Sequence, residues 1–235
     1  MNCALLLAAS GAASSSPPVA GFVGWWDFSD AASITMDGSQ VGAIADKSGN
    51  GRTLSKGANG PTRVTSAGLG AGALSHARFA SGVTGARVTR ADASGVTGDF
   101  TLLVAARKQT DFRTSGTSDY LVGGLHGLQV GVDNTALFIN KNGSFTTIST
   151  TPADWNTAAV HVVKLSGTSY SVWRNLVAKL TNSAGSVGSA AETTLGNPGA
   201  TDLDWDIGEA VLYASALSDA NREAVTTYLA AKWGA

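Results

Sequence analysis

Short apolar runs separated by turn residues cover most of this chain and predict many β-strands. The runs recur roughly every eight to twelve residues, a spacing typical of a β-sandwich or jelly roll. The clearest run is residues 100–107, FTLLVAAR, which follows the turn pair Gly98-Asp99 and predicts a central buried strand. The segment Lys141 to Ser144 contains Asn-Gly, a dipeptide that tight hairpin turns prefer. One β-rich domain is therefore expected.

An aromatic strand is predicted near the start of this domain, over residues 21–28, GFVGWWDF. Strict alternation places Phe22, Trp26 and Phe28 on one face of the strand and Val23 and Trp25 on the other. Both faces are therefore expected to be buried, or one aromatic side chain faces a cleft or a partner. Residues 29–41, which follow, are predicted to form a loop or a short turn segment.

The chain closes with a predicted strand and a predicted helix, over residues 206–233. The strand is apolar-rich, and Ser218 is suited to cap the free N–H groups of the first helical turn. Helical spacing places four apolar residues on one face of the helix, and we expect this face to pack on the sheet. They are Val225, Tyr228, Leu229 and Trp233. The more exposed flank of the helix is expected to carry Arg222, Thr226 and Lys232.

Residues 1–20 are predicted to form an extended N-terminal arm, ahead of one jelly-roll domain at residues 21–235. The apolar core of the arm is short and no Lys or Arg precedes it, which argues against a secretory signal peptide. The arm is expected to pack on its own domain or on a neighbouring subunit, with an uncleaved signal as the third alternative. The residues predicted to contact a partner are Leu5, Leu6, Leu7, Pro17 and Pro18.

Composition narrows the classes of function. The 235 residues are 43% hydrophobic and only 14% charged, which supplies ample core material and a surface of small polar residues. The net charge is -1 and no basic run is present, so nucleic acid is not expected as a ligand. The single cysteine, Cys3, excludes an intrachain disulfide, and no apolar run approaches the roughly 20 residues that span a bilayer. Neither membrane insertion nor a cofactor is predicted.

Three blocks of sequence carry a resemblance to a known superfamily. The first joins residues 24–30, GWWDFSD, to residues 46–51, DKSGNG, and the second is the apolar run at 100–106. The third joins residues 207–213 and 216–218 to YLAAKWG at 228–234. Together they resemble the concanavalin A-like, laminin-G-like jelly-roll superfamily over residues 21–234.

This resemblance implies an all-β fold: a concanavalin A-like jelly-roll sandwich with a short C-terminal helix and the extended N-terminal arm. The branch that the blocks resemble is common among structural proteins of tailed-phage particles and in bacterial surface proteins. One fold hosts many roles, so function has to be argued from sites.

An acidic run at residues 202–209, DLDWDIGE, is the main candidate for catalysis or metal binding. Asp204, Asp206 and Glu209 loosely resemble the E-x-D-x-x-E strand motif of laminarinase-like hydrolases, with Asp at the first position. A retaining glycosidase needs two carboxylates about 5 Å apart. Alternatively, Asp202, Asp204 and Asp206 offer oxygen ligands to calcium. The alternative without chemistry is a set of solvated or capping carboxylates, and no metal is included in the leading prediction.

Sugar binding depends on the tryptophans. Lectins of this fold hold a sugar by stacking it on an exposed aromatic ring beside polar groups. The predicted sugar-binding residues are Trp25, Trp155 and Trp205, with Trp173 also available. Their alternative role is packing in the core or at a strand edge.

The leading hypothesis is a non-enzymatic virion structural protein, a capsid decoration or cement protein on the exterior of a phage particle. It rests on the resemblance, on the missing catalytic signatures and on the apolar arm. The partners would be the major capsid protein or another virion protein, with further copies of the chain in a homo-oligomer. The alternative is a carbohydrate-binding, lectin-like adhesion module, and the third hypothesis is a glycoside hydrolase.

Overall fold

The structure is a computed structural model that describes residues 15–65, 69, 74–81, 86–90, 96, 98–109, 119–124, 128–132, 137–141, 144–150, 156–185, 193–196 and 202–235. A 3-10 turn, η1 (Ala31–Ser33), and one helix, α1 (Asp219–Trp233), accompany the strands. The strands are β1 (Phe22–Asp27), β2 (Ile34–Asp37), β3 (Gln40–Ile44), β4 (Leu54–Lys56), β5 (Thr62–Val64), β6 (His76–Ser81), β7 (Arg87–Arg90), β8 (Phe100–Lys108), β9 (Asp119–Gly123), β10 (Leu128–Val132), β11 (Leu137–Lys141), β12 (Ser144–Ser149), β13 (Ala159–Ser166), β14 (Ser169–Arg174), β15 (Val177–Ala184), β16 (Thr193–Gly196) and β17 (Asp202–Tyr213).

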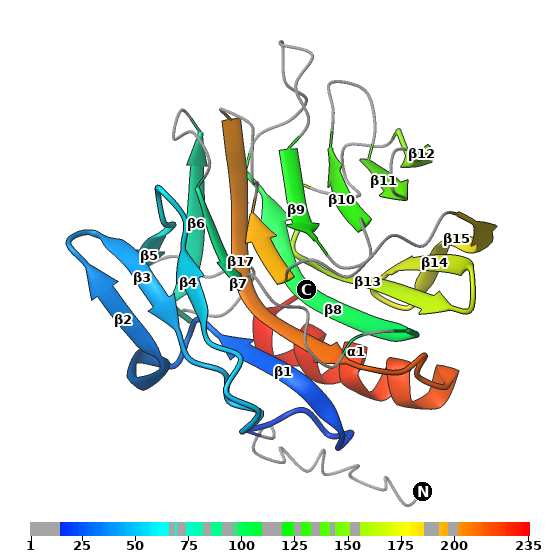
Figure 1. Ribbon diagram of the computed structural model, residues 1–235, viewed down its shortest axis with the longest axis horizontal. Helices are drawn as coiled ribbons and strands as arrows, with labels where there is room; N and C mark the ends of the chain where they lie inside the picture. The colour runs from blue at the N-terminus through cyan, green and yellow to red at the C-terminus, as the bar shows by residue number, and fades with distance from the viewer. Residues whose placement is uncertain are drawn as a thin grey trace, which may run out of the picture.

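The strands pair antiparallel in two layers, which makes the fold an all-β sandwich, as predicted (Figure 1). The helix-side sheet runs β1–β17–β8–β13–β14–β15, and β6 and β5 extend it from the first half of β17. The opposite sheet runs β2–β3–β4–β7–β16–β9–β10–β11–β12. The β3–β5 pairing joins the two sheets along one edge. Helix α1 covers the outer face of the helix-side sheet (Figure 1).

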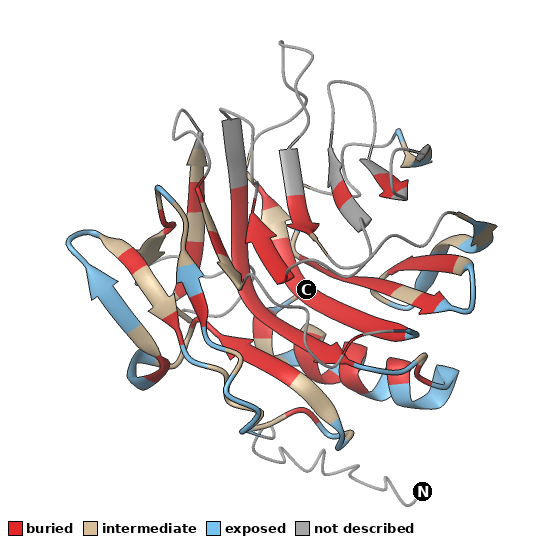
Figure 2. Cartoon of the chain, viewed as in Figure 1, coloured by how far each residue is buried: buried red, intermediate tan, exposed pale blue. Residues whose placement is uncertain are grey.

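Two hydrophobic cores result from this arrangement, one on each face of the helix-side sheet. The sandwich core lies between the two sheets and contains Trp26, Phe28 and Trp205. The helix core lies between the helix-side sheet and α1, and contains Trp25 and Trp233. Figure 2 shows the buried residues concentrated along β8, β17 and α1. The sheet in the middle is therefore apolar on both faces.

Strand β8 shows why this middle sheet reads as a continuous apolar run. Its even-numbered residues Leu102 and Val104 face the sandwich core, whereas Leu103 and Ala105 face the helix core. It is paired on one side with β13 and on the other with β17. The prediction of a central strand at residues 100–107 is confirmed.

Strand β17 carries a β-bulge at Gly208. The register with β8 shifts between Ile207 and Glu209, and the carbonyl of Gly208 accepts a hydrogen bond from the N–H of Phe28. A Cβ at this position would lie 2.5 Å from atoms of both Leu69 and Trp233, so only glycine fits. The bulge brings Glu209 to the helix side, the same side as Asp206.

Helix α1 begins and ends as the sequence predicts. The Oγ of Ser218 accepts a hydrogen bond from the N–H of Asn221, and Gly234 ends the helix with φ 66°. The stripe of Val225, Tyr228, Leu229 and Trp233 is buried, as expected.

The flank of α1 that was predicted to be exposed is partly buried. Arg222 is only 4% exposed, because its guanidinium stacks 4.4 Å from the ring centroid of Trp173. Thr226 is fully buried, and its hydroxyl donates to the carbonyl of Arg222. The hydrophobic pattern misassigned both residues because it does not register that a guanidinium can stack on an indole ring or that a hydroxyl can donate to a carbonyl of its own helix.

The start of the domain differs from the prediction in two respects. A register shift between Phe22 and Gly24 places Phe22 in the helix core and Val23 against the sandwich core, the reverse of strict alternation. Residues 29–41 are not simply a loop, because they contain η1, β2 and the start of β3. Ile34 of β2 pairs with Ile44 of β3 across this hairpin.

The N-terminal arm is described only from Ser15 onward, so Leu5, Leu6 and Leu7 lie outside the described residues. Pro17 is buried and Pro18 is exposed. The carbonyl of Val19 accepts a hydrogen bond of 2.8 Å from the hydroxyl of Tyr213, which attaches the segment after Pro18 to the end of β17. No helix in the described part of the chain is long and apolar enough to cross a membrane.

Candidate functional site

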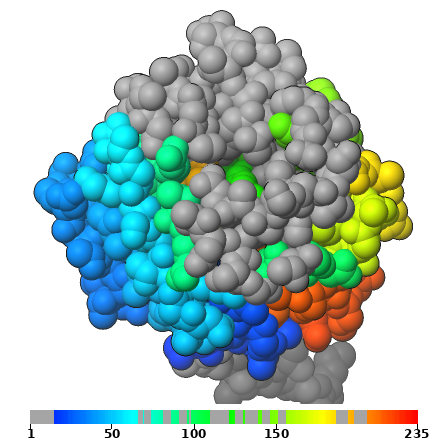
Figure 3. Space-filling view, viewed as in Figure 1, coloured from blue at the N-terminus to red at the C-terminus, as the bar shows by residue number. Residues whose placement is uncertain are grey.

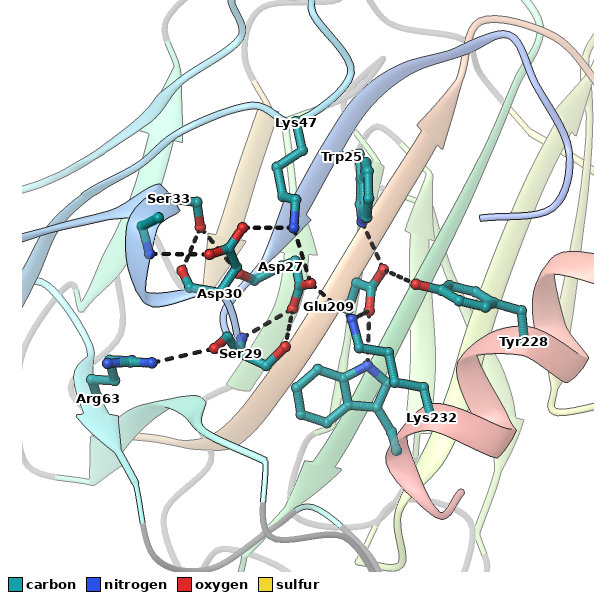
Figure 4. Close-up of polar contacts among 12 residues, drawn as sticks. Trp25, Asp27, Ser29, Asp30, Ser33, Lys47, Arg63, Glu209, Tyr228 and Lys232 are labelled. Carbon is teal, nitrogen blue, oxygen red and sulfur yellow. Dashed lines mark hydrogen bonds and ion pairs between the residues drawn. The ribbon is translucent and has the colours of Figure 1, made fainter. Parts of the chain in front are cut away.

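A buried carboxylate, Glu209, lies at the centre of a polar network between β1, β17 and α1 (Figure 4). Its Oε1 accepts from the Nε1 of Trp25 at 2.6 Å and from the hydroxyl of Tyr228 at 3.1 Å. Its Oε2 accepts from the Nζ of Lys232 at 2.6 Å and from the Nε1 of Trp233 at 3.0 Å. Four donors on two oxygens offset much of the cost of burying the charge.

A second carboxylate, Asp27, shares a lysine with Glu209. Asp27 is the cross-strand partner of Glu209 in the β1–β17 ladder, and its Oδ2 lies 2.8 Å from the Nζ of Lys232. Lys47 lies 3.4 Å from the same oxygen and 2.7 Å from the Oδ2 of Asp30. The result is an alternating chain of carboxylates and ammonium groups that runs from the buried interior toward the surface (Figure 4).

The ionisation of these groups follows from their neighbours. Burial by itself raises the pKa of Asp27, but hydrogen bonds from Lys232 and Ser29, and the charges of Lys232 and Lys47, hold that pKa below its usual range. Burial and the adjacent charge of Glu209 raise the pKa of Tyr228 far above its usual range. At neutral pH Asp27 is therefore a carboxylate, and Tyr228 is a neutral hydrogen-bond donor.

The turn after β3 attaches to this network through Asp46. Its Oδ1 accepts from the backbone N–H groups of Trp25 at 3.0 Å and of Ser48 at 2.8 Å. Its Oδ2 accepts from the Ser48 hydroxyl and from the N–H of Arg52. The first and third sequence blocks, although about 200 residues apart, therefore meet in one network. Sequence reasoning named these blocks but did not predict that they would meet.

Asp206, another carboxylate of the acidic run at residues 202–209, has different partners from Glu209. It is fully buried and lies between Arg78 of β6 and Arg107 of β8, its direct neighbours in the two adjacent strands. Arg78 donates through Nε at 3.0 Å and through Nη2 at 3.2 Å, and Arg107 donates through Nη2 at 3.0 Å. Gln109 also donates to this carboxylate, and the Nε2 of His76 lies 3.4 Å from its Oδ1.

These partners decide what Asp206 can do. Burial raises its pKa, but His76, Arg78 and Arg107 together outweigh burial and hold the pKa far below its usual range. A carboxylate occupied by two guanidinium groups does not fit the calcium role considered for Asp202, Asp204 and Asp206. The side chains of Asp202 and Asp204 lie outside the description. Within the part of the chain that is described, no cluster of three or more His, Cys, Asp or Glu side chains is arranged to hold a metal.

The tryptophans that were predicted to bind a sugar are mostly buried. Trp25 is 7% exposed and donates to Glu209, and Trp205 is fully buried in the sandwich core. Neither ring is open to a sugar, so the stacking role predicted for these two residues does not fit the structure. Trp173 is 8% exposed and lies under Arg222. Trp155 lies outside the described residues, so its predicted role stays a prediction.

A shallow groove of about 400 Å³ lies between α1 and the turn that joins β14 to β15. Figure 3 shows α1 beside the β13–β15 region on the molecular surface. The groove is mostly apolar, and it adjoins the exposed side chains of Leu176 and Val177. It is lined by Asn175, Leu176, Thr226, Thr227, Ala230, Ala231 and Ala235.

Comparison with solved structures shows which fold this is. A Trypanosoma rangeli sialidase in complex with sialic acid is similar, with a TM-score of 0.66, 18% identity, and coverage of 93% of this chain and 34% of the sialidase. The same sialidase with 2,3-difluorosialic acid is also similar, with a TM-score of 0.66 and 16% identity over 97% of this chain and 35% of that one. The binding domain of Paraclostridial Mosquitocidal Protein 1 follows, with a TM-score of 0.63, 13% identity, and coverage of 90% and 52%.

No family model matches the sequence, and no curated protein matches it. At identities below a fifth, these likenesses establish a concanavalin A/sialidase-like β-sandwich and no more. The chain spans about one third of the length of the sialidases it matches. The three structures include no phage protein, so the virion part of the resemblance stays untested.

The expectation that the chain is not an enzyme needs correction. It rested on a resemblance to structural proteins and on missing sequence signatures, whereas the similar solved structures include sialidases, which are glycoside hydrolases. Missing sequence motifs are a weak argument in this fold, because catalytic side chains converge from distant strands and loops.

Proposed function

We propose that this chain is a glycan-binding module with a concanavalin A/sialidase-like fold. One observation carries the proposal. Nearly the whole chain matches about one third of a sialidase that was solved in complex with sialic acid, and it also matches about half of the binding domain of a mosquitocidal protein. A domain that recurs in proteins of different size is suited to bind a ligand on behalf of the larger protein that contains it.

The internal contacts narrow the set of residues that are available to bind a glycan. Glu209 and Asp206, the buried acids of the run, are held by protein donors on every side. Trp25 and Trp205 are committed to the interior. Of the three tryptophans predicted to bind sugar, Trp155 is therefore the one that remains a candidate platform.

A glycan array that includes sialylated and neutral oligosaccharides tests the proposal. We expect a binder, and we expect Trp155→Ala to weaken binding by about fivefold, since a stacking contact is worth roughly 1 kcal/mol. The matched control is Trp25→Phe, which should lower stability and leave glycan affinity unchanged. No binder on the array, or equal affinity in Trp155→Ala, would count against the module or against its platform respectively.

Glycoside hydrolysis is a second candidate, favoured by the sialidases among the similar structures. Incubation of the purified chain with a fluorogenic sialoside tests it directly. Asp206 and Glu209 are buried and bonded to protein donors, so we expect release of the fluorophore to be kept in Asp206→Asn and Glu209→Gln when circular dichroism shows that both are folded. Release that is lost in both folded variants would instead support the acidic run as the catalytic site. Release that is unchanged in both variants would place the catalytic groups elsewhere, and no release would remove this candidate for sialosides.

Decoration of a phage particle, with the arm docked on the major capsid protein or on a sister subunit, remains a proposal. The contacts at the junction between the proposed arm and the domain support this proposal. Pro17 is buried, and the carbonyl of Val19 accepts a hydrogen bond from Tyr213, so the residues before Pro17 would form the arm. Deleting residues 1–16 keeps this junction intact. The deletion should abolish oligomer formation and co-sedimentation with particles if the arm is the attachment, and unchanged behaviour would contradict that role.

A further inference from the structure

The ammonium of Lys232 lies between two carboxylates that come from different strands. Its Nζ is 2.8 Å from the Oδ2 of Asp27 and 2.6 Å from the Oε2 of Glu209 (Figure 4). The three side chains are 15%, 5% and 0% exposed. Burying charges is costly even when they are paired, and joining an amine to a carboxyl as an amide removes two of them at once.

We propose that Lys232 and Asp27 condense into an intramolecular isopeptide bond, with Glu209 as the base. The Nζ of Lys232 forms a bond with the Cγ of Asp27, and the bond from that Cγ to Oδ2 breaks. Oδ2 leaves as water, and no oxidant, metal or other reactant is needed.

The contacts of Asp27 favour attack on this carboxyl rather than on Glu209. Its Oδ1 accepts from the backbone N–H of Ser29 at 3.0 Å and from the Ser29 hydroxyl at 2.6 Å. These donors are already aimed at the oxygen that becomes the oxyanion when the carbon turns tetrahedral. Glu209, whose two oxygens are held by four donors, is fixed in place as the group that moves the proton.

The protons balance within the three side chains. One proton passes from the ammonium of Lys232 to the Oδ2 of Asp27, which converts an ion pair into a neutral amine and a neutral acid without changing the net charge. After the Nζ attacks, a second proton moves from nitrogen through Glu209 to Oδ2, which departs as water. The amide keeps one hydrogen, and Glu209 ends as the carboxylate that it was at the start.

The surroundings protect the product. The indoles of Trp25 and Trp233 and the ring of Tyr228 surround Glu209 and keep it from solvent. Low access of water slows hydrolysis of the new amide. The two linked positions are 205 residues apart, so the bond would tie the first strand to the last helix. Pulling or partial unfolding from either end would then meet a covalent closure.

Intact-mass spectrometry of the full chain tests the inference. We expect the wild-type mass to lie below the sequence mass by one water molecule, and the mass of Lys232→Arg to equal its sequence mass. Proteolysis should yield one branched peptide that joins Asp27 to Lys232. A wild-type chain at full sequence mass would overturn the proposal, and a branch at Glu209 or Lys47 would overturn the assignment of the linked residues.

Three variants separate chemistry from folding. Asp27→Asn should form the same amide by losing ammonia in place of water, so its linked product should have the same mass as the linked wild-type chain. Glu209→Gln should lose at least tenfold in the rate of linkage, with circular dichroism as the check that it is folded. Lys47→Arg, the matched control on the neighbouring lysine, should keep the full loss of water. Linkage in Glu209→Gln at the wild-type rate would remove Glu209 as the base.

Discussion

Two buried carboxylates on β17, Asp206 and Glu209, lie three residues apart and are held by different kinds of donor. The partners of Asp206 include Arg78 and Arg107, which face it across the adjacent strands. The partners of Glu209 come from β1 and α1, and three of its four donors are neutral groups. Asp206 therefore stabilises the pairing of β17 with β6 and β8, whereas Glu209 attaches the helix-side sheet to α1.

The difference teaches how one strand serves two purposes. Before the bulge at Gly208, β17 is held at its edges by charged neighbours that are still about 30% exposed, since Arg78 is 32% and Arg107 is 29% exposed. After the bulge it lies under α1, where Glu209 has one charged partner, Lys232, and three neutral indole and phenol donors. The same acidic run is thus a sheet clamp at one end and a helix anchor at the other.

The largest expected effect comes from breaking the helix anchor. Glu209→Ala leaves Lys232 and three neutral donors without their shared acceptor, and we expect a loss of roughly 3–5 kcal/mol in the free energy of unfolding. Urea denaturation measures it. The matched control is Glu223→Gln, a side chain that is 53% exposed, which should change stability by less than about 0.5 kcal/mol. A change of equal size in both variants would contradict the anchor role.

Removing the boundary between the two regions should cost somewhat less. Gly208→Ala places a Cβ 2.5 Å from atoms of Leu69 and Trp233, and overpacking of this kind typically costs about 1–3 kcal/mol. Thermal unfolding measures the cost. Gly98→Ala, where a new Cβ meets no atom within 4 Å, is the control and should stay near the wild-type midpoint. A wild-type midpoint for Gly208→Ala would mean that the bulge does not depend on glycine.

The sheet clamp should show itself through pH. The pKa of Asp206 in the folded protein lies below its unfolded value of 3.8, so its contribution to stability is present above that value and is lost as the pH falls. Asp206→Asn should cost about 2 kcal/mol at neutral pH. It should also lose less stability than the wild type between roughly pH 5 and pH 2. Parallel pH profiles for the two proteins would contradict the clamp.

The smallest effect tests how the four donors share Glu209. Trp25→Phe keeps the aromatic ring and removes one N–H donor, which should cost about 1 kcal/mol because three donors remain. Denaturant titration should resolve it. A loss as large as that of Glu209→Ala would mean that the Trp25 donor alone keeps the carboxylate buried.

Local patterns predicted the elements well where one physical rule dominated. The run at 100–107, the Ser218 cap and the stripe on α1 each follow from short-range periodicity and capping, and each is confirmed. Prediction was wrong where a single residue broke the period. The register shift after Phe22 reversed the faces of β1. Arg222 and Thr226 are buried because the guanidinium stacks on the ring of Trp173 and the hydroxyl donates to the carbonyl of Arg222.

The candidate site was predicted only as a set of separate blocks. The sequence by itself determined the all-β class, the closing helix and the residues GWWDFSD, DKSGNG and KWG that mark the fold. Only the tertiary structure decided that Trp25, Asp27, Lys232 and Glu209 meet, and that Asp206 lies with two arginines instead. The reason is that contacts between residues about 200 positions apart depend on strand order and on one bulge, which leave no periodic trace in the chain.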